Sequence, residues 1–84
     1  MADFLAFAQI GAGGSWARDN TIEKAVKRFG KIARSDWKGV YDLSGPLKVG
    51  VWDVEGHDQL IMGPDGVRDS ETMEVLPILE VRTV

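Results

Sequence analysis

The feature that most constrains the fold is one amphipathic segment between residues 20 and 38. Its apolar side chains recur every three or four residues, which is the spacing of one helix face. They are Ile22, Ala25, Val26, Phe29, Ile32, Ala33 and Trp37. At 100° per residue they fall within an arc of about 140°. We predict that Asn20 caps this helix, that Glu23 completes a capping box, and that the helix ends before Gly39.

The other segments are short and typical of strands. Residues 4–10 are aromatic and aliphatic and precede four residues rich in glycine, which favours a strand; their alanines and leucine also suit a short helix. Residues 47–54, 59–62 and 67–70 are further predicted strands, and Gly63-Pro64-Asp65-Gly66 is a tight-turn sequence. A last strand over 73–84 is interrupted by Pro77, which indicates an edge strand or a bulge.

These elements predict one domain, residues 1–84, of the α+β class. A single helix packs on an antiparallel sheet of four to five strands, in the order strand, helix and then three or four strands. The 84 residues include no cysteine, which excludes a disulfide, a thiol nucleophile or a thiolate metal site. No apolar run approaches the roughly 20 residues of a membrane span, and Asp3 stands where a secretory signal has basic residues. We therefore expect a cytoplasmic domain with no membrane partner.

The charges are strongly segregated along the chain. Seven of the ten basic residues lie between Arg18 and Lys38, opposed there by three acidic ones; the rest of the chain holds three basic and ten acidic residues. The basic residues of the helix, opposite its apolar stripe, are predicted to form an anion-binding face. The candidate contact residues on this face are Lys24, Lys27, Arg28, Lys31 and Lys38. A plain solvated face, an acidic protein partner and nucleic acid all remain open as its role.

Motifs for catalysis or cofactor binding are weak. The glycines at 11–14 lack the third glycine of a dinucleotide loop, because Trp16 takes that place, so they are read mainly as a connection. His57 lies among Asp53, Glu55 and Asp58, but no second cluster completes a metal shell, so a solvated hairpin turn is the preferred interpretation. The serines lack a nucleophile-elbow sequence. We expect no enzyme, no catalytic residue, no metal and no cofactor; catalysis by His57 with neighbouring carboxylates is the third hypothesis.

Two tryptophans and the acidic meander complete the candidate binding residues. Trp16 and Arg18, beside the glycine loop, are of the residue types that anchor interfaces, although Trp16 also suits a lid on the core. Trp52 lies in a predicted strand and faces away from Val51. The remaining candidates are the carboxylates Asp53, Glu55 and Asp58.

The predicted strands carry apolar residues on both faces. Leu5 and Phe7 oppose Phe4, Ala6 and Ala8 in the first strand, and the middle and last strands show the same pattern. One helix covers only one face of a sheet, so the other face is expected to keep an apolar patch. A homodimer through this open face, or docking on a larger partner, would cover the patch.

In outline, this compact acidic strand–helix–meander chain resembles small phage-encoded inhibitors, including anti-CRISPR proteins. It is also similar to antitoxin-like and double-stranded-RNA-binding-like α+β modules. The first resemblance implies stoichiometric blocking of a nucleic-acid-handling complex in the host cytoplasm. We therefore predict a non-enzymatic protein-binding domain, homodimeric, that acts as an inhibitor or regulator. The alternative is a nucleic-acid-binding module that uses the basic face of the helix at residues 21–38.

Overall fold

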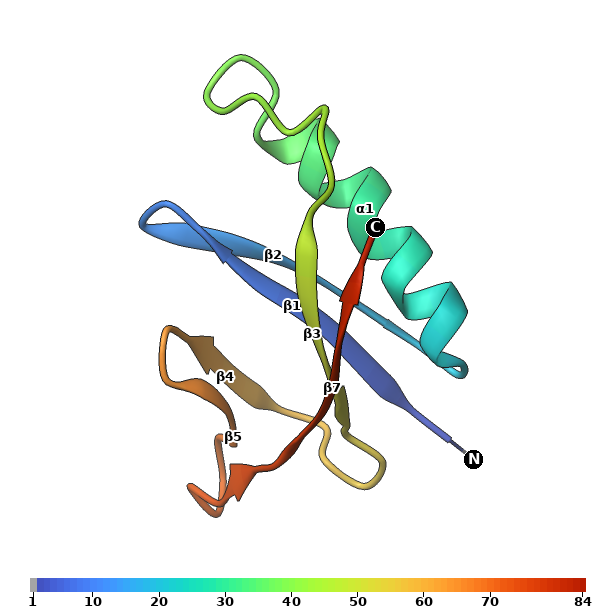
Figure 1. Cartoon of the computed structure of the whole chain (residues 1–84). Coiled ribbons are helices and arrows are strands. Elements are labelled where there is room, and N and C mark those ends of the chain that lie inside the picture. The colour runs from blue at the N-terminus through green and yellow to red at the C-terminus, as the bar shows by residue number, and fades with distance from the viewer. Residues whose placement is uncertain (1) are drawn as a thin grey trace.

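The computed structural model describes residues 2–84 and has one helix and seven strands (Figure 1). In chain order these are β1 (Phe4–Ile10), β2 (Gly13–Asp19), α1 (Ile22–Asp36), β3 (Lys48–Asp53), β4 (Leu60–Gly63), β5 (Gly66–Asp69), β6 (Val75–Leu76) and β7 (Ile78–Thr83). The first sheet has the order β2-β1-β3-β7, and β4, β5 and β6 form a second, smaller sheet. All pairs are antiparallel. The predicted α+β class, with one helix on an antiparallel sheet, is confirmed.

The glycine segment differs from its prediction as a connection to the helix. Gly11, with a φ of +59°, and Ala12 form a tight turn, and the chain returns antiparallel to β1 as β2. The order therefore begins strand, strand, helix. The side chains of β2 that face α1 are small because the helix lies close to them. Ser15 and Ala17 are buried, and a Cβ on Gly13 would come within 3.0 Å of the Trp37 ring.

Helix α1 is confirmed, and its N-cap is Thr21 rather than Asn20. Thr21 has an extended backbone, and its hydroxyl accepts a hydrogen bond from the Lys24 amide at 3.2 Å. This one-residue shift leaves Lys24, not Glu23, three residues after the cap, so the predicted capping box does not form. Gly30 allows close packing of α1 on the C-terminus, since a Cβ there would lie 3.0 Å from the Val84 side chain.

The first core lies between α1 and one face of the larger sheet. It is built from the predicted helix stripe and from the strand residues that point toward it. Its buried members are Ala6, Ile10, Ala17, Ala25, Val26, Phe29, Ala33, Val49 and Val51.

The opposite face of the larger sheet is covered in part by the smaller sheet, which corrects the expectation of an open apolar face. Leu5, Phe7, Trp52 and Val54 point to this side, and Val67 of β5 and Leu76 of β6 pack on them. All of these side chains are buried. The chain thus supplies much of the cover that was expected from a second molecule, because the meander folds back as a separate sheet instead of extending the first.

Pro77 separates β6 from β7 and so divides the last strand between the two sheets. The register of β7 on β3 shifts between Val51 and Trp52, which leaves Leu79 as an extra residue in a β-bulge. The interruption predicted for the last strand is confirmed, and β7 is an edge strand. The helix of the described chain is too short and too polar to cross a membrane.

Candidate protein-binding surface

The exposed apolar surface of the larger sheet is concentrated on β7. The exposed fractions of Val81, Ile78 and Leu79 are 61%, 51% and 51%. Val81 is opposite Gly50 in the register and Ile78 is opposite Trp52, so both side chains lie on the face that carries the smaller sheet. The smaller sheet covers β1 and β3 but leaves these β7 side chains in solvent. We call Ile78, Leu79 and Val81, with the backbone of β7, the β7 edge.

The outer backbone groups of β7 have no strand beside them in the described chain. Leu47 and Val84 exchange both of their backbone hydrogen bonds, at 2.8 and 2.9 Å. Hydrogen-bonded pairs alternate along an antiparallel ladder, so Arg82 and Glu80 also point their backbone groups toward β3. The N–H and C=O groups of Val81 and Thr83 therefore point outward, where they can pair with another strand.

A groove of about 310 Å³ runs beside the β7 edge on the same face. Val81, Ile78, Gly50 and the tip of the β4–β5 hairpin at Pro64 are among its lining residues. The floor at Gly50 is occupied by the Trp52 ring, which would lie 2.6 Å from a Cβ at that position. The groove gives an incoming strand room for its own side chains.

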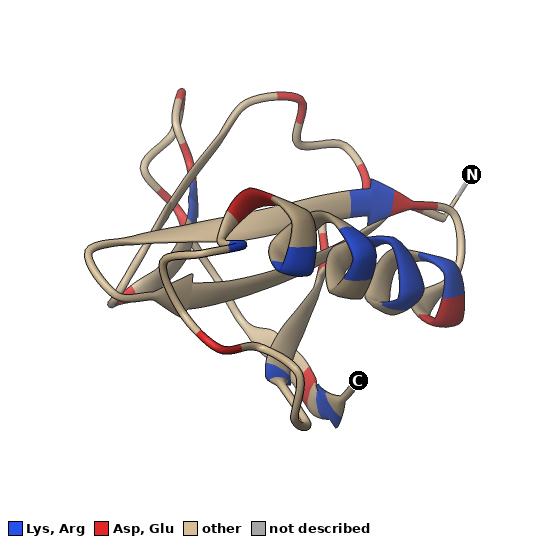
Figure 2. Cartoon of the chain, turned by 90° about the horizontal axis from the view of Figure 1, so that it is seen from above, with Lys and Arg blue, Asp and Glu red and all other residues tan. Residues whose placement is uncertain are grey.

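Lys and Arg residues recur on successive turns of α1 (Figure 2), and the basic face predicted from the helical spacing is exposed. The side chains of Lys24, Lys27, Arg28, Lys31 and Lys38 all lie in solvent. Arg28 also pairs with Asp19 at 3.4 Å and donates to the Arg18 carbonyl. Arg34 is held differently, because its guanidinium donates to the carbonyls of Leu43, Gly45 and Val84 and so ties the loop after the helix to the C-terminus.

Trp16 and Arg18 lie on β2 rather than on a mobile loop. Trp16 is 49% exposed and lines a groove of about 440 Å³ together with Arg28 and Ile32 of α1. Trp16 is opposite Phe7 in the register, so its side chain lies on the face that carries the smaller sheet, away from α1. Arg18 has a structural role, since it forms an ion pair with Asp3 and donates to the carbonyls of His57 and Asp58.

Trp52 is not available to a partner, which corrects its place among the candidate contact residues. Its side chain is only 7% exposed, because it packs in the second core against Phe7 with ring centroids 6.2 Å apart. Asp53, Glu55 and Asp58 are exposed at the end of β3 and in the connection from β3 to β4. The Asp53 carboxylate accepts a hydrogen bond from the Glu55 amide, as in an ordinary turn.

His57 is paired with a residue that the sequence did not single out. Its Nδ1 lies 2.6 Å from Oδ2 of Asp69, and the other carboxylate oxygen accepts the amides of Glu71 and Thr72. The His57 hydrogen bond, followed by those from Thr72 and Glu71, lowers the pKa of Asp69 from its ordinary value of 3.8. Residues 57 and 69 are distant in sequence and carry no spacing signal, so only the return of β5 brings them together.

The described side chains form no cluster that could hold a metal ion. No group of three or more histidine, aspartate or glutamate side chains gathers within residues 2–84. The hydroxyl of the buried Ser15 lies 3.3 Å from the Asp36 carboxylate and accepts the Trp37 indole N–H at 3.1 Å, with no histidine beside it in either contact. These contacts join β2 to the end of α1.

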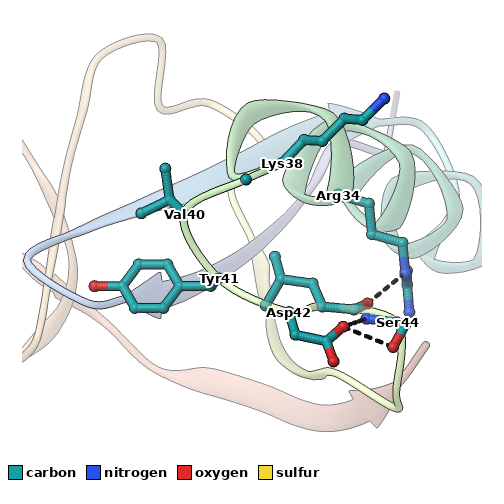
Figure 3. A pocket seen from close by; sticks show the side chains of 8 residues that line it. Arg34, Lys38, Val40, Tyr41, Asp42 and Ser44 are labelled. Carbon is teal, nitrogen blue, oxygen red and sulfur yellow. Dashed lines mark hydrogen bonds between the residues drawn. The ribbon is translucent and has the colours of Figure 1, made fainter.

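A cavity of about 520 Å³ lies in the loop that follows α1 (Figure 3). Its polar groups bond to one another. Asp42 accepts hydrogen bonds from the Ser44 hydroxyl and amide, which lower the pKa of Asp42, and Arg34 donates to the Leu43 carbonyl. Tyr41 instead contacts Trp37, with ring centroids 5.7 Å apart. These hydrogen bonds give the loop a defined structure and tie it to α1.

Comparison with protein-family models, with curated proteins and with solved structures finds no match to this chain. The function is therefore argued from the two surfaces just described, the β7 edge and the basic face of α1.

Proposed function

We propose that this chain is a non-enzymatic protein-binding domain that recognises its partner by strand addition at the β7 edge, and that it acts as a stoichiometric inhibitor or regulator. One observation carries the proposal: an edge strand with outward backbone groups at Val81 and Thr83 also exposes Ile78, Leu79 and Val81. Natural edge strands are usually shortened, covered or charged, so exposed apolar residues in such a strand favour pairing with another chain. Main-chain hydrogen bonds supply affinity in this mode of binding, and side-chain pockets supply specificity.

A second candidate function is nucleic-acid binding by the basic face of α1. The specific observation in its favour is the row of exposed cations on α1, at Lys24, Lys27, Arg28 and Lys31, because such cations can neutralise the phosphates of a nucleic acid. The net charge of −3 opposes this candidate, since the acidic side chains outside the helix repel a polyanion.

Matched surface variants separate the two functions. Val81→Lys places a charge on the β7 edge, and Lys31→Glu reverses one on α1; both positions are exposed, so both variants should fold. In affinity capture from cell lysate, we expect Val81→Lys to lose about 90% of the bound partner, on the order of 1–2 kcal/mol, and Lys31→Glu to keep it.

If instead Lys31→Glu loses the partner and Val81→Lys keeps it, the binding surface is the basic face of α1 and not the β7 edge. In that case the wild type should also bind single-stranded or duplex nucleic acid, and this binding should weaken steeply with salt. Fluorescence anisotropy with labelled DNA and RNA at low and high salt measures this directly.

A further inference from the structure

We infer that the strand received by the β7 edge is β7 of a second copy of this chain, in a two-fold register centred on Val81. This inference rests on the proposed function, because it names the partner of the same edge. Two antiparallel copies of β7 would join the two larger sheets into one continuous sheet of eight strands. Two features of β7 support this register: its outward backbone groups and the positions of its charged side chains.

The free backbone groups restrict the registers. Val81 and Thr83 point outward from β3, whereas Glu80 and Arg82 point toward it. An added antiparallel strand must offer its own outward groups to these positions, so odd-numbered residues face odd-numbered residues. The two-fold axis can then pass through residue 80, 81 or 82 within the regular part of the strand.

Charge complementarity selects one of these three registers. An axis at residue 80 would set Glu80 opposite the partner's Glu80, and an axis at residue 82 would set Arg82 opposite the partner's Arg82. An axis at Val81 instead sets Glu80 opposite the partner's Arg82, and Arg82 opposite the partner's Glu80. Opposite charges directly across an antiparallel pair are stabilising, whereas like charges are destabilising.

The charged side chains of β7 are half-exposed, and within one copy Arg82 pairs with Glu80 and lies 4.0 Å from the carboxylate of Glu23 on α1. Glu80 and Arg82 lie 3.0 Å apart on the helix side, and each is 38% exposed. Helix α1 packs mainly over β2 and β1, so it leaves this edge accessible. On the other face, Val81 would lie opposite the partner's Val81, and the apolar surface that is now 61% exposed would be covered.

Charge-reversal variants test this register, because it sets residue 80 of each copy opposite residue 82 of the other. Glu80→Arg alone places two arginines opposite each other across the interface, and Arg82→Glu alone places two glutamates together. Each single variant should dimerise at least about tenfold more weakly than the wild type. A mixture of the two single variants restores both opposite-charge pairs, as does the double variant Glu80→Arg/Arg82→Glu. Lys27→Glu on α1 is the control and should dimerise as the wild type does.

Sedimentation equilibrium from low to high micromolar concentration measures the assembly. We expect the wild type, the mixture and the double variant to approach twice the chain mass of 9.2 kDa, while each single variant stays near 9.2 kDa. Amide hydrogen exchange gives a second readout on the wild type alone, since the Val81 and Thr83 amides should exchange more slowly as concentration rises. Circular dichroism confirms that each variant is folded.

Three results would overturn the inference: a wild type that stays monomeric at high micromolar concentration, single variants that dimerise as well as the wild type, or a mixture that fails to associate. A monomeric wild type whose capture of another protein still depends on Val81 would leave the proposed function standing, with a strand from that protein as the occupant. If the wild type dimerises but Val81→Lys leaves the capture of another protein unchanged, the dimer stands and the proposed function is contradicted.

Discussion

At the scale of single residues, the loops of the smaller sheet are held by a few buried or half-buried polar contacts. Asp69 is 7% exposed at the end of β5, where its carboxylate binds His57 and two amides of the following turn. This turn includes Met73, whose φ of +63° is unusual for a residue with a side chain. Arg18 also donates to the carbonyl of His57, in the loop between β3 and β4. The smaller sheet is therefore positioned by specific hydrogen bonds as well as by its apolar residues.

Asp69 predicts an acid-dependent loss of stability. Because its pKa is lowered in the folded protein, the unfolded chain takes up the proton first as pH falls. The stability that the ionised carboxylate contributes is present above the ordinary value of 3.8 and is lost as pH falls through the lower folded pKa. We expect Asp69→Asn to lower Tm at pH 7, and the difference in Tm from the wild type to shrink below pH 3.8.

Thermal denaturation followed by circular dichroism across this pH range provides the test. Glu74→Gln, which removes an exposed carboxylate from the same turn, is the matched control and should follow the wild type. An equal effect of both substitutions would show that general charge, not the contact with His57, is responsible.

At the scale of elements, the sequence predicts that α1 forms and which face is buried, whereas its first residue depends on the Thr21 hydroxyl that caps it. The apolar stripe determines which face is buried, and Ala25, Val26, Phe29 and Ala33 are buried as the spacing predicts. Asn20 and Thr21 are both residues that cap helices well, so sequence alone could not choose between them. The choice falls on Thr21 because β2 continues to Asp19, and the chain needs Asn20 to turn away from the strand.

Thr21→Ala tests this cap. The substitution removes the acceptor of the Lys24 amide and should lower the free energy of unfolding by about 1 kcal/mol. Asn20→Ala is the control at the neighbouring position and should have an effect within about 0.5 kcal/mol. Urea denaturation of the three proteins measures both values, and a larger loss for Asn20→Ala would return the cap to the residue that the capping-box pattern favoured.

At the scale of the whole molecule, two cores share one sheet. Leu5 and Phe7 of β1 enter the second core, while Ala6 and Ile10 of the same strand enter the first. Because β1 contributes side chains to both cores, neither core can unfold without disturbing residues that pack in the other. We therefore expect the domain to unfold in a single cooperative transition.

Truncation of one buried side chain in each core tests this cooperativity. Phe29→Ala in the first core should cost about 3–5 kcal/mol and Leu76→Ala in the second about 2–5 kcal/mol. Helix circular dichroism and the fluorescence of Trp52 in the second core should give coincident urea transitions in the wild type and in both variants, with Trp16 and Trp37 replaced by phenylalanine so that Trp52 is the one tryptophan left. Separate transitions would show that the smaller sheet is an independent unit.

What the sequence determined by itself is local: the helix and its faces, the β1 strand, the Gly63–Gly66 turn and the segregation of charge. These features depend on residues close in the chain, whose periodicity and turn chemistry are visible in one dimension. Strand β2 was not predicted, because its glycines and small residues are typical of a loop. Their small size is explained only by the packing of α1 over this strand.

Only the tertiary structure decided which apolar face is covered and which remains open. The change of sheets at Pro77 sends Leu76 into the second core and leaves Ile78 and Val81 at an edge, although all three belong to one apolar run. The burial of Trp52 and the pairing of His57 with Asp69 arise in the same way. Each depends on contacts between segments far apart in the chain, whose free energy is gained only after the elements have packed, and so no local pattern records them.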